Sequence, residues 1–408
     1  MLILHTIPVL TLSGPQRGTA ELCGRLIRRG FPCAALSLTG DGPGRVYYEN
    51  HGVPIHTIDG KSMNRLRLGA EIARLAKKLG ATALHGHPDR VPLWIARLLT
   101  GLPTFMTLHR YGFDGRINRA VMKLTSMFIS GYAGVSRQVC DYLIEVDRIH
   151  PSRVFLIPNG LDFEQFHPGA VSREAARRQL NIAPERKVIG YVGRLGHRKG
   201  LHHLIRATAE RDDLLCLLAG GGYFEPELRQ MASSLGLGED RLRFLGRVSD
   251  PRPVYAACDI AVSMGRGESF NRGFAEPLAL GVPAVALGQG GVPEVVPPSC
   301  YGLLIREYST AALVDKLDYL FDNRKVAAKL TERAGEYLRQ QFSLEQMAAA
   351  SERLYRRTLV EGKRPSPPWR GRKAPRLKGV HNPWHSAAWL PEEQSLTTRD
   401  LGQDPHNL

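Results

Sequence analysis

The chain has 408 residues, enough for two domains that each bury a core, and its 43% hydrophobic and 23% charged residues are typical of a soluble globular protein. No apolar run reaches the roughly 18 residues of a membrane-spanning helix, so no such helix is expected. The formal net charge of +16 favours an acidic partner: a phosphorylated substrate, an anionic lipid surface or a nucleic acid.

Apolar runs alternate with helical patterns along most of the chain, which is typical of βα units around a parallel sheet. Residues 1–7 lack a basic start and a cleavage site, so they predict a first buried strand rather than a signal peptide, in a cytoplasmic protein. The clearest other strands are predicted at residues 81–84, 104–108, 154–157, 188–192, 214–218, 243–245, 260–263 and 284–287. Helices are predicted between them, for example at residues 20–29, 66–79, 117–128, 201–210, 225–235, 311–321 and 325–342.

A break is predicted where Pro158 and Gly160 follow a strand. The fold class is therefore α/β, with two Rossmann-like domains whose parallel sheets face each other across a cleft. The first domain is predicted at residues 1–163 and the second at 164–343, and a last helix, 344–360, returns to the first. Residues 361–408 have too little patterned apolar surface to offset their ordering entropy, which predicts a disordered basic tail.

Two cations, Arg194 and Lys199, lie in a strand-to-helix turn between Gly193 and Gly200. A diphosphate leaving group gains negative charge as its bond breaks, and fixed cations stabilise that charge better than water does. An isolated pair of this kind is more often a solvated surface pair, but the two glycines and the preceding strand favour a functional role. The spacing of an ATP-binding loop is absent.

Two carboxylates, Glu268 and Glu276, flank a loop that enters a helix. One acid can accept from sugar hydroxyls and the other from a ribose, while the helix N-terminus between them faces a diphosphate. The alternative, two ordinary helix-surface acids, is disfavoured because the surrounding segment carries little other charge. Pro277 lacks an N–H, so the helix is expected to begin late or to kink there.

These motifs, in this order, resemble those of the retaining GT-B glycosyltransferases of family 4, which include glycolipid mannosyltransferases and sugar transferases of lipopolysaccharide synthesis. The resemblance covers roughly residues 1–360. It is carried by residues 12–17, 107–109, 134–136, 157–162, 193–200, 244–248, 268–276 and 290–294.

The resemblance implies a site for a nucleotide-diphosphate sugar. Its catalytic residues are His109, Arg194, Lys199 and Glu268, with His109 reaching the transferred sugar. Its donor-binding residues are Gly14, Gly193, Arg194, Lys199, Leu245, Val248, Glu268, Phe270, Asn271 and Glu276. Within this set, Arg194 and Lys199 bind the diphosphate, Glu268 the sugar hydroxyls and Glu276 the ribose. A satisfied histidine at a strand end is the alternative for His109.

The sequence departs from the family pattern at Ser13 and Asn271, which replace glycines, and at Pro277. No Asp-x-Asp motif occurs, so we expect no metal and no cofactor besides the donor. His85 and His87 are expected to have a structural role at a strand end rather than to form a metal pair. The six cysteines have no spacing typical of zinc or redox motifs.

The function implied is transfer of a hexose-type sugar, with retention, to a glycan or lipid-linked acceptor in cell-surface polysaccharide or glycolipid synthesis. One alternative is a GT-B nucleotide-sugar epimerase, which would lack the paired cations and acids. Another is a basic nucleic-acid-binding protein, which would need a patch of interleaved basic and aromatic residues. An inactive scaffold is disfavoured because every site position is filled. Asp250 is compatible with guanine or uracil donors. Basic helices predicted at 65–78 and 116–123 favour peripheral attachment to an anionic membrane surface.

Overall fold

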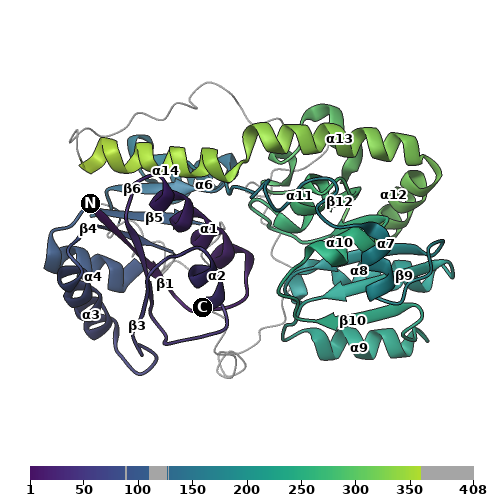
Figure 1. The fold of residues 1–408 in the computed structure, drawn as a ribbon, viewed down its shortest axis with the longest axis horizontal. Helices are drawn as coiled ribbons and strands as arrows, with labels where there is room; N and C mark the ends of the chain where they lie inside the picture. Colours follow the sequence, from purple (N-terminus) through teal and green to yellow (C-terminus); the bar gives the residue numbers. More distant parts are fainter. Residues whose placement is uncertain (88–89, 110–125, 127, 360–408) are drawn as a thin grey trace. The chain divides into compact units, whose positions relative to one another are not determined.

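The computed structural model describes residues 1–87, 90–109, 126 and 128–359, which belong to one compact unit of the chain. These residues form two separate parallel sheets covered by helices (Figure 1). Most of the predicted helix 117–128 lies outside the described residues, and so do the basic stretch 116–123, with Arg116, Arg119 and Lys123, and the predicted tail.

The first sheet has the strand order β3-β2-β1-β4-β5-β6-β7, and every neighbouring pair is parallel. Its strands are β1 (Leu2–Ile7), β2 (Cys33–Ser37), β3 (Ile55–Thr57), β4 (Ala81–Gly86), β5 (Thr104–Leu108), β6 (Gly131–Gly134) and β7 (Val154–Leu156). The helices between them are α1 (Gly14–Arg28), α2 (Arg45–Asn50), α3 (Arg65–Lys78), α4 (Arg90–Thr100), α6 (Arg137–Glu145) and η1 (Pro151–Arg153).

A hydrophobic core lies on each face of this sheet, because successive strand residues point to opposite faces. Leu4 of β1 packs in the core that includes residues of α3, α4 and α6, whereas Ile3 packs with residues of α1. The second core also holds Leu354 and Tyr355 of α14 (Leu344–Leu359), the last described helix, which lies beside α1. Burial on both faces explains the continuous apolar runs of these strands.

The second sheet has the order β10-β9-β8-β11-β12-β13 and is also parallel throughout. Its strands are β8 (Lys187–Val192), β9 (Leu214–Ala219), β10 (Leu242–Gly246), β11 (Ile260–Ser263), β12 (Ala284–Leu287) and β13 (Leu304–Ile305). Its helices are α7 (Arg173–Gln179), η2 (His197–Lys199), α8 (Leu201–Ala209), α9 (Glu225–Ser234), α10 (Arg252–Ala257), α11 (Arg272–Ala279), η3 (Val292–Glu294), η4 (Pro298–Leu303), α12 (Thr310–Asp322) and α13 (Arg324–Gln341).

Both sheets have a point at which the strand order reverses, between β1 and β4 in the first and between β8 and β11 in the second. In open parallel sheets, ligands bind outside the carboxyl ends of the strands at such a point. The loops that follow these four strands are therefore where a site is expected. The loops after β8 and β11 contain Gly193, Arg194, Lys199, Glu268, Phe270 and Asn271 of the sequence-predicted site.

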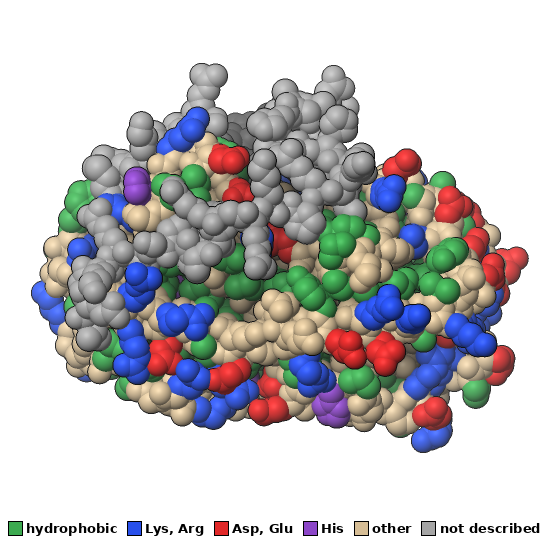
Figure 2. Space-filling model, turned by 90° about the horizontal axis from the view of Figure 1, so that it is seen from above, with side chains coloured by type: hydrophobic (Ala, Val, Ile, Leu, Met, Phe, Trp, Pro, Cys, Tyr) green, Lys and Arg blue, Asp and Glu red, His purple; other side chains and the backbone are tan. Residues whose placement is uncertain are grey.

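The described surface carries charges of both signs. On the face shown in Figure 2, Lys and Arg side chains are interspersed with Asp and Glu side chains. None of the helices within the described ranges has the combined length and apolar character needed to cross a bilayer.

Candidate functional site

The turn after β8 is packed so closely that it requires glycines. A Cβ added to Gly220, after the neighbouring strand β9, would lie 1.8 Å from the carbonyl oxygen of Gly193. Gly200 has a left-handed backbone, with φ at +67°, and a Cβ there would lie 2.6 Å from the carbonyl oxygen of Met264. Any other residue would have to displace backbone at these positions, so the glycines fix the course of the turn.

This turn places Arg194 and Lys199 at the carboxyl end of β8, beside the loop that follows β11. The Lys199 Nζ lies 2.5 Å from Oε1 of Glu268, and both side chains are largely buried. Burial lowers the pKa of Lys199, but the Glu268 carboxylate and the Tyr191 hydroxyl together outweigh burial and raise the pKa above its ordinary value. Arg194 is exposed and close enough to oppose that rise, and among the described residues no acid pairs with it. A cation is thus available at the point where the strand order reverses.

The loop between Glu268 and α11 contains two buried polar atoms that have no partner among the described residues, Oγ of Ser269 and Nδ2 of Asn271. The backbone of Asn271 is left-handed, with φ at +64°. Glycine and asparagine adopt that conformation most readily, which explains why asparagine can replace the family's glycine here. Phe270 is buried, and its ring packs against that of Phe342 with centroids 5.4 Å apart.

Glu276 lies in a buried charge cluster that joins α1 to α11. Its Oε1 accepts from Arg17 and, at 2.8 Å, from Nε of Arg272, which also pairs with Glu21 at 3.1 Å. No described residue donates to its Oε2, so one carboxylate oxygen is free for a ligand. A Cβ on Gly14, the first residue of α1, would lie 3.3 Å from Cδ of Arg272. We call Arg17, Glu21, Arg272 and Glu276 the α1–α11 charge cluster.

Of the two outcomes expected from Pro277, a late start or a kink, the late start is wrong. The helix begins at Arg272 and includes Pro277. The proline removes one bond, the one that an N–H at position 277 would donate to the carbonyl of Gly273. Because Phe274 and Leu278 on either side are buried, packing outweighs this loss.

Two further motifs lie at the same edge of the second sheet. Leu245 and Val248 contribute to the core of that sheet, and Gly246 between them, with φ at +68°, accepts a backbone hydrogen bond from Gly220 at 2.6 Å. Glu294 in η3 accepts from the backbone N–H groups of Arg137 and Gln138 at 2.9 and 3.1 Å. Burial raises the pKa of Glu294 to about 7, although both N–H donors act to lower it.

Four histidines, three of them buried, form a group at the carboxyl edge of the first sheet, namely His5, His85, His87 and His109. His85 bonds to the hydroxyls of Tyr355 and Thr107, at 2.5 and 2.8 Å, so both its ring nitrogens have partners. His87 Nδ1 lies 2.9 Å from Nε2 of His109, and the rings stack with centroids 5.2 Å apart. Burial lowers the pKa of His109 to about 4, so this imidazole is neutral at pH 7. Its Nδ1 is buried and has no partner among the described residues.

One cluster could not be found from the sequence. His5, Cys23 and Cys33 come from β1, α1 and β2, and their potential ligand atoms lie within 4.8 Å of one another. The three residues follow no motif spacing, and only the parallel pairing of β1 with β2 brings two of them together. Three donors are one fewer than the four of a structural zinc site.

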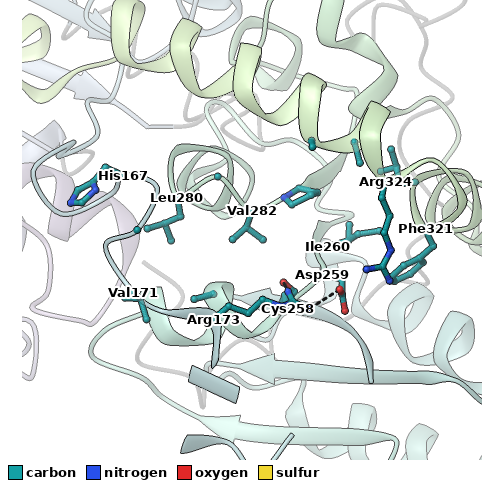
Figure 3. Close-up of a pocket in the computed structure, with 17 residues that line it drawn as sticks. His167, Val171, Arg173, Cys258, Asp259, Ile260, Leu280, Val282, Phe321 and Arg324 are labelled. Atoms are coloured by element: carbon teal, nitrogen blue, oxygen red, sulfur yellow. Dashed lines mark hydrogen bonds and ion pairs between the residues drawn. The ribbon is translucent and has the colours of Figure 1, made fainter. Parts of the chain in front are cut away.

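A pocket of about 410 Å³ lies elsewhere on the second sheet (Figure 3). It is lined by residues at the amino ends of β11 and β12, among them Asp259, Ile260 and Pro283, and Arg173 pairs with Asp259 at its wall. No residue of the sequence-predicted site lines it. It is at the opposite edge of the sheet from the loops that follow the carboxyl ends.

Comparisons with known proteins agree with this architecture. Residues 12–165 match the family model described as Glycosyltransferase Family 4, and residues 172–340 match the model described as Glycosyl transferases group 1. Two similar relatives are the D-inositol 3-phosphate glycosyltransferases of Mycobacterium marinum and Corynebacterium glutamicum. The first is 34% identical over 227 residues, 53% of this chain and 48% of the relative; the second is 36% identical over 222 residues, 50% and 52%. The chain thus spans about half the length of these relatives.

Solved structures show the same fold. The Anabaena protein HepE, in complex with UDP and glucose, superposes with a TM-score of 0.77 at 23% identity, covering 86% of this chain and 98% of HepE. A glycosyltransferase from Rickettsia africae superposes with a TM-score of 0.76 at 21% identity, covering 89% of this chain and 99% of that one.

Proposed function

The chain belongs to the GT-B glycosyltransferases of family 4, and we propose that it transfers a hexose-type sugar, with retention, from a nucleoside diphosphate sugar to an acceptor hydroxyl. The observation that carries the proposal is the Lys199–Glu268 pair beside the exposed Arg194, at the point where the strand order of the second sheet reverses. Cations and an acid are both needed there, because the donor presents a diphosphate next to sugar hydroxyls.

In this proposal the donor diphosphate binds to Arg194 and Lys199, which stabilise its charge as the glycosidic bond breaks. Glu268 then accepts from sugar hydroxyls, and the free Oε2 of Glu276 accepts from the ribose. The acceptor attacks from the face that the diphosphate leaves, and the diphosphate takes its proton. The two side-chain cations carry out the role of a metal ion, so we expect transfer to continue in the presence of a chelator.

We further propose that the donor base is uracil. Asp250, which follows β10 near Leu245 and Val248, is the acid that could accept hydrogen bonds from guanine. Its carboxylate already accepts from the Arg252 side chain, from Nε at 2.9 Å and from Nη2 at 2.8 Å. The Asp250 carboxylate also accepts from the Arg252 backbone N–H at 3.0 Å. The crystal structures of HepE hold UDP or UDP-glucose, which supports the same choice.

The acceptor is proposed to be a glycan or lipid-linked glycan, presented at an anionic membrane surface. The apolar residues Leu68 and Ile72 of α3 are buried in the first-sheet core. Its basic side chains are exposed, namely Arg65, Arg67, Arg74, Lys77 and Lys78. Each cation near an anionic leaflet contributes roughly 1 kcal/mol, enough in sum for reversible attachment.

The test is a transfer assay with UDP-, GDP- and ADP-sugars and a panel of acceptors that includes inositol 3-phosphate and lipid-linked glycans. The expected result is a product with the donor's anomeric configuration, formed from a UDP-sugar with EDTA present. Inversion, or conversion of the donor to its epimer without transfer, would contradict the proposal. Liposome sedimentation tests the membrane surface. The protein is expected to sediment with anionic but not neutral liposomes, and less so when the five α3 cations are changed to Gln.

A further inference from the structure

The cluster of His5, Cys23 and Cys33 brings an imidazole and two thiols together between β1, α1 and β2. One ring nitrogen of His5 and the two Sγ atoms all lie within 4.8 Å of one another. That limit is close to twice a metal–sulfur distance of about 2.3 Å, so small side-chain rotations are enough for all three atoms to reach one ion. We call these three residues the His–Cys cluster.

His5 has one ring nitrogen to which no described residue bonds. Its Nδ1 lies 3.3 Å from Nε2 of His87, whereas its own Nε2 is buried and has no hydrogen-bond partner among the described residues. A buried polar atom without a partner costs free energy and calls for an explanation, such as an ion that binds there. A histidine that ligates a metal through one nitrogen bonds to a protein group through the other, and His87 lies where that group is expected.

The chemistry of the donors selects the kind of ion. Thiolate sulfur favours soft cations such as Cu⁺ and Zn²⁺, and imidazole suits copper and zinc as well. Mg²⁺, Ca²⁺ and Mn²⁺ prefer oxygen ligands and are therefore disfavoured. Both cysteines belong to a hydrophobic core that includes Ile3 and Phe105, so water competes little for an ion bound there.

The number of donors separates the two soft cations. A structural zinc site has four protein ligands, and a zinc site with three protein ligands completes its tetrahedron with water or substrate. His5 and Cys23 are fully buried and Cys33 is 2% exposed, which keeps bulk water from such a position. Cu⁺ is the softer ion, and three donors of this kind complete its coordination without a water molecule.

We propose that the His–Cys cluster is a three-ligand site for Cu⁺, with Nε2 of His5 and the sulfurs of Cys23 and Cys33 as its ligands. Both cysteines ligate as thiolates, so their two protons pass to solvent as the ion binds. The ion joins β1, α1 and β2 and thereby stabilises the folded state. This site is separate from the donor site, where we expect no metal, and it does not depend on sugar transfer.

The test uses the full-length, reduced protein under anaerobic conditions, titrated with Cu⁺ in competition with bathocuproine disulfonate. One tightly bound Cu⁺ per protein is expected, with a thiolate-to-copper absorption band in the near ultraviolet. X-ray absorption of the complex should show two sulfurs and one nitrogen around the copper. Failure to compete with the chelator, a copper shell without sulfur, or tighter binding of Zn²⁺ than of Cu⁺ would overturn the proposal. None of these measurements requires a variant to fold.

Variants assign the ligands, and each is first checked by thermal unfolding without copper. Cys33→Ala and His5→Phe are each expected to weaken Cu⁺ binding more than about 100-fold, because loss of a ligand costs more than loss of a partner beyond it. The control is Cys140→Ala, which removes an equally buried thiol from the core on the other face of the same sheet and should leave Cu⁺ affinity unchanged.

Thermal unfolding provides a second readout. Cu⁺ should raise the Tm of the wild-type protein and of Cys140→Ala by several degrees, but not that of Cys33→Ala. Equal Cu⁺ affinity in wild type and folded Cys33→Ala, or an equal loss in Cys140→Ala and Cys33→Ala, would contradict the proposal.

Discussion

At the carboxyl edge of the first sheet the polar side chains include histidines bonded to one another, whereas at the edge of the second sheet Lys199 pairs with Glu268. Burial lowers the pKa values of His87 and His109, which are therefore uncharged at pH 7, while the Glu268 carboxylate helps to raise the pKa of Lys199, which stays charged. The difference suits a substrate with a neutral sugar at one end and a diphosphate at the other. In the proposed function, each edge would provide the type of hydrogen bond that its part of the donor requires.

The α1–α11 charge cluster connects these two regions, and breaking it is expected to have the largest effect. Arg272→Ala leaves Glu21 and Glu276, both nearly buried, without this cation. We expect a loss of about 3–5 kcal/mol in the free energy of unfolding, as for a buried pair with one partner removed. Urea denaturation measures it. In the control, Arg45→Ala breaks an exposed pair with Asp41 and should change stability by less than 1 kcal/mol. Equal losses of stability in the two variants would contradict a stabilising role of Arg272 in the buried charge cluster.

The charged character of the second edge is tested by Lys199→Ala. Removal of a fixed charge stabiliser is expected to lower the rate of sugar transfer by about 10²- to 10³-fold while the fold remains intact. Arg194→Ala should have a similar effect. Lys187→Ala provides a matched control, because Lys187 lies at the amino end of the same strand and pairs with the half-exposed Asp213. Near-normal turnover in both site variants would show that the leaving group binds elsewhere.

Glu268→Gln is expected to have an intermediate effect, which changes recognition of the donor sugar but not binding of the nucleotide. The amide accepts hydrogen bonds through one oxygen only, so discrimination among donor sugars should fall about tenfold. The nucleoside diphosphate alone should bind with nearly unchanged affinity, which competition assays with UDP and a series of UDP-sugars measure. Loss of UDP binding itself would assign Glu268 another role.

The smallest effect is expected at Glu294, which bonds to the start of α6. Because its pKa of about 7 in the folded protein exceeds the ordinary value of 4.5, the folded state binds the proton more tightly than the unfolded state does. As the pH rises from 4.5 to about 7, the free energy of unfolding of the wild-type protein should therefore fall relative to that of Glu294→Gln. The expected fall, reduced by solvent screening, is on the order of 1 kcal/mol. Thermal unfolding of both proteins across this range measures it. Parallel pH profiles would contradict the raised pKa.

Much of the fold was predictable because buried parallel strands have continuous apolar runs. The predicted strands 104–108, 260–263 and 284–287 coincide with β5, β11 and β12. By contrast, β6 was not among the strands predicted with clarity, since two of its four residues are glycines. A Cβ on Gly131 would lie 2.9 Å from the Phe155 ring, so packing rather than strand propensity selects that residue.

Helix α1 shows a similar limit. Its predicted start at residue 20 was wrong, because the helix begins at Gly14 with Pro15 in its first turn, where a missing N–H costs little. The partners of the site residues were even harder to predict from the sequence. His5 and His87 are 82 residues apart in the chain, and Arg17 and Glu276 are 259 apart. Motif spacing carries no information on such pairs, which depend on the sheet order and the packing of α1 against α11.

The most direct test of the central claim is calorimetric titration of the protein and its Lys199→Ala variant with UDP and with GDP. If the carboxyl edge of the second sheet binds the donor diphosphate, wild-type protein will bind UDP more tightly than GDP, and Lys199→Ala will weaken UDP binding at least tenfold. UDP binding of equal strength to both proteins would contradict the claim that Lys199 and its neighbours hold the diphosphate.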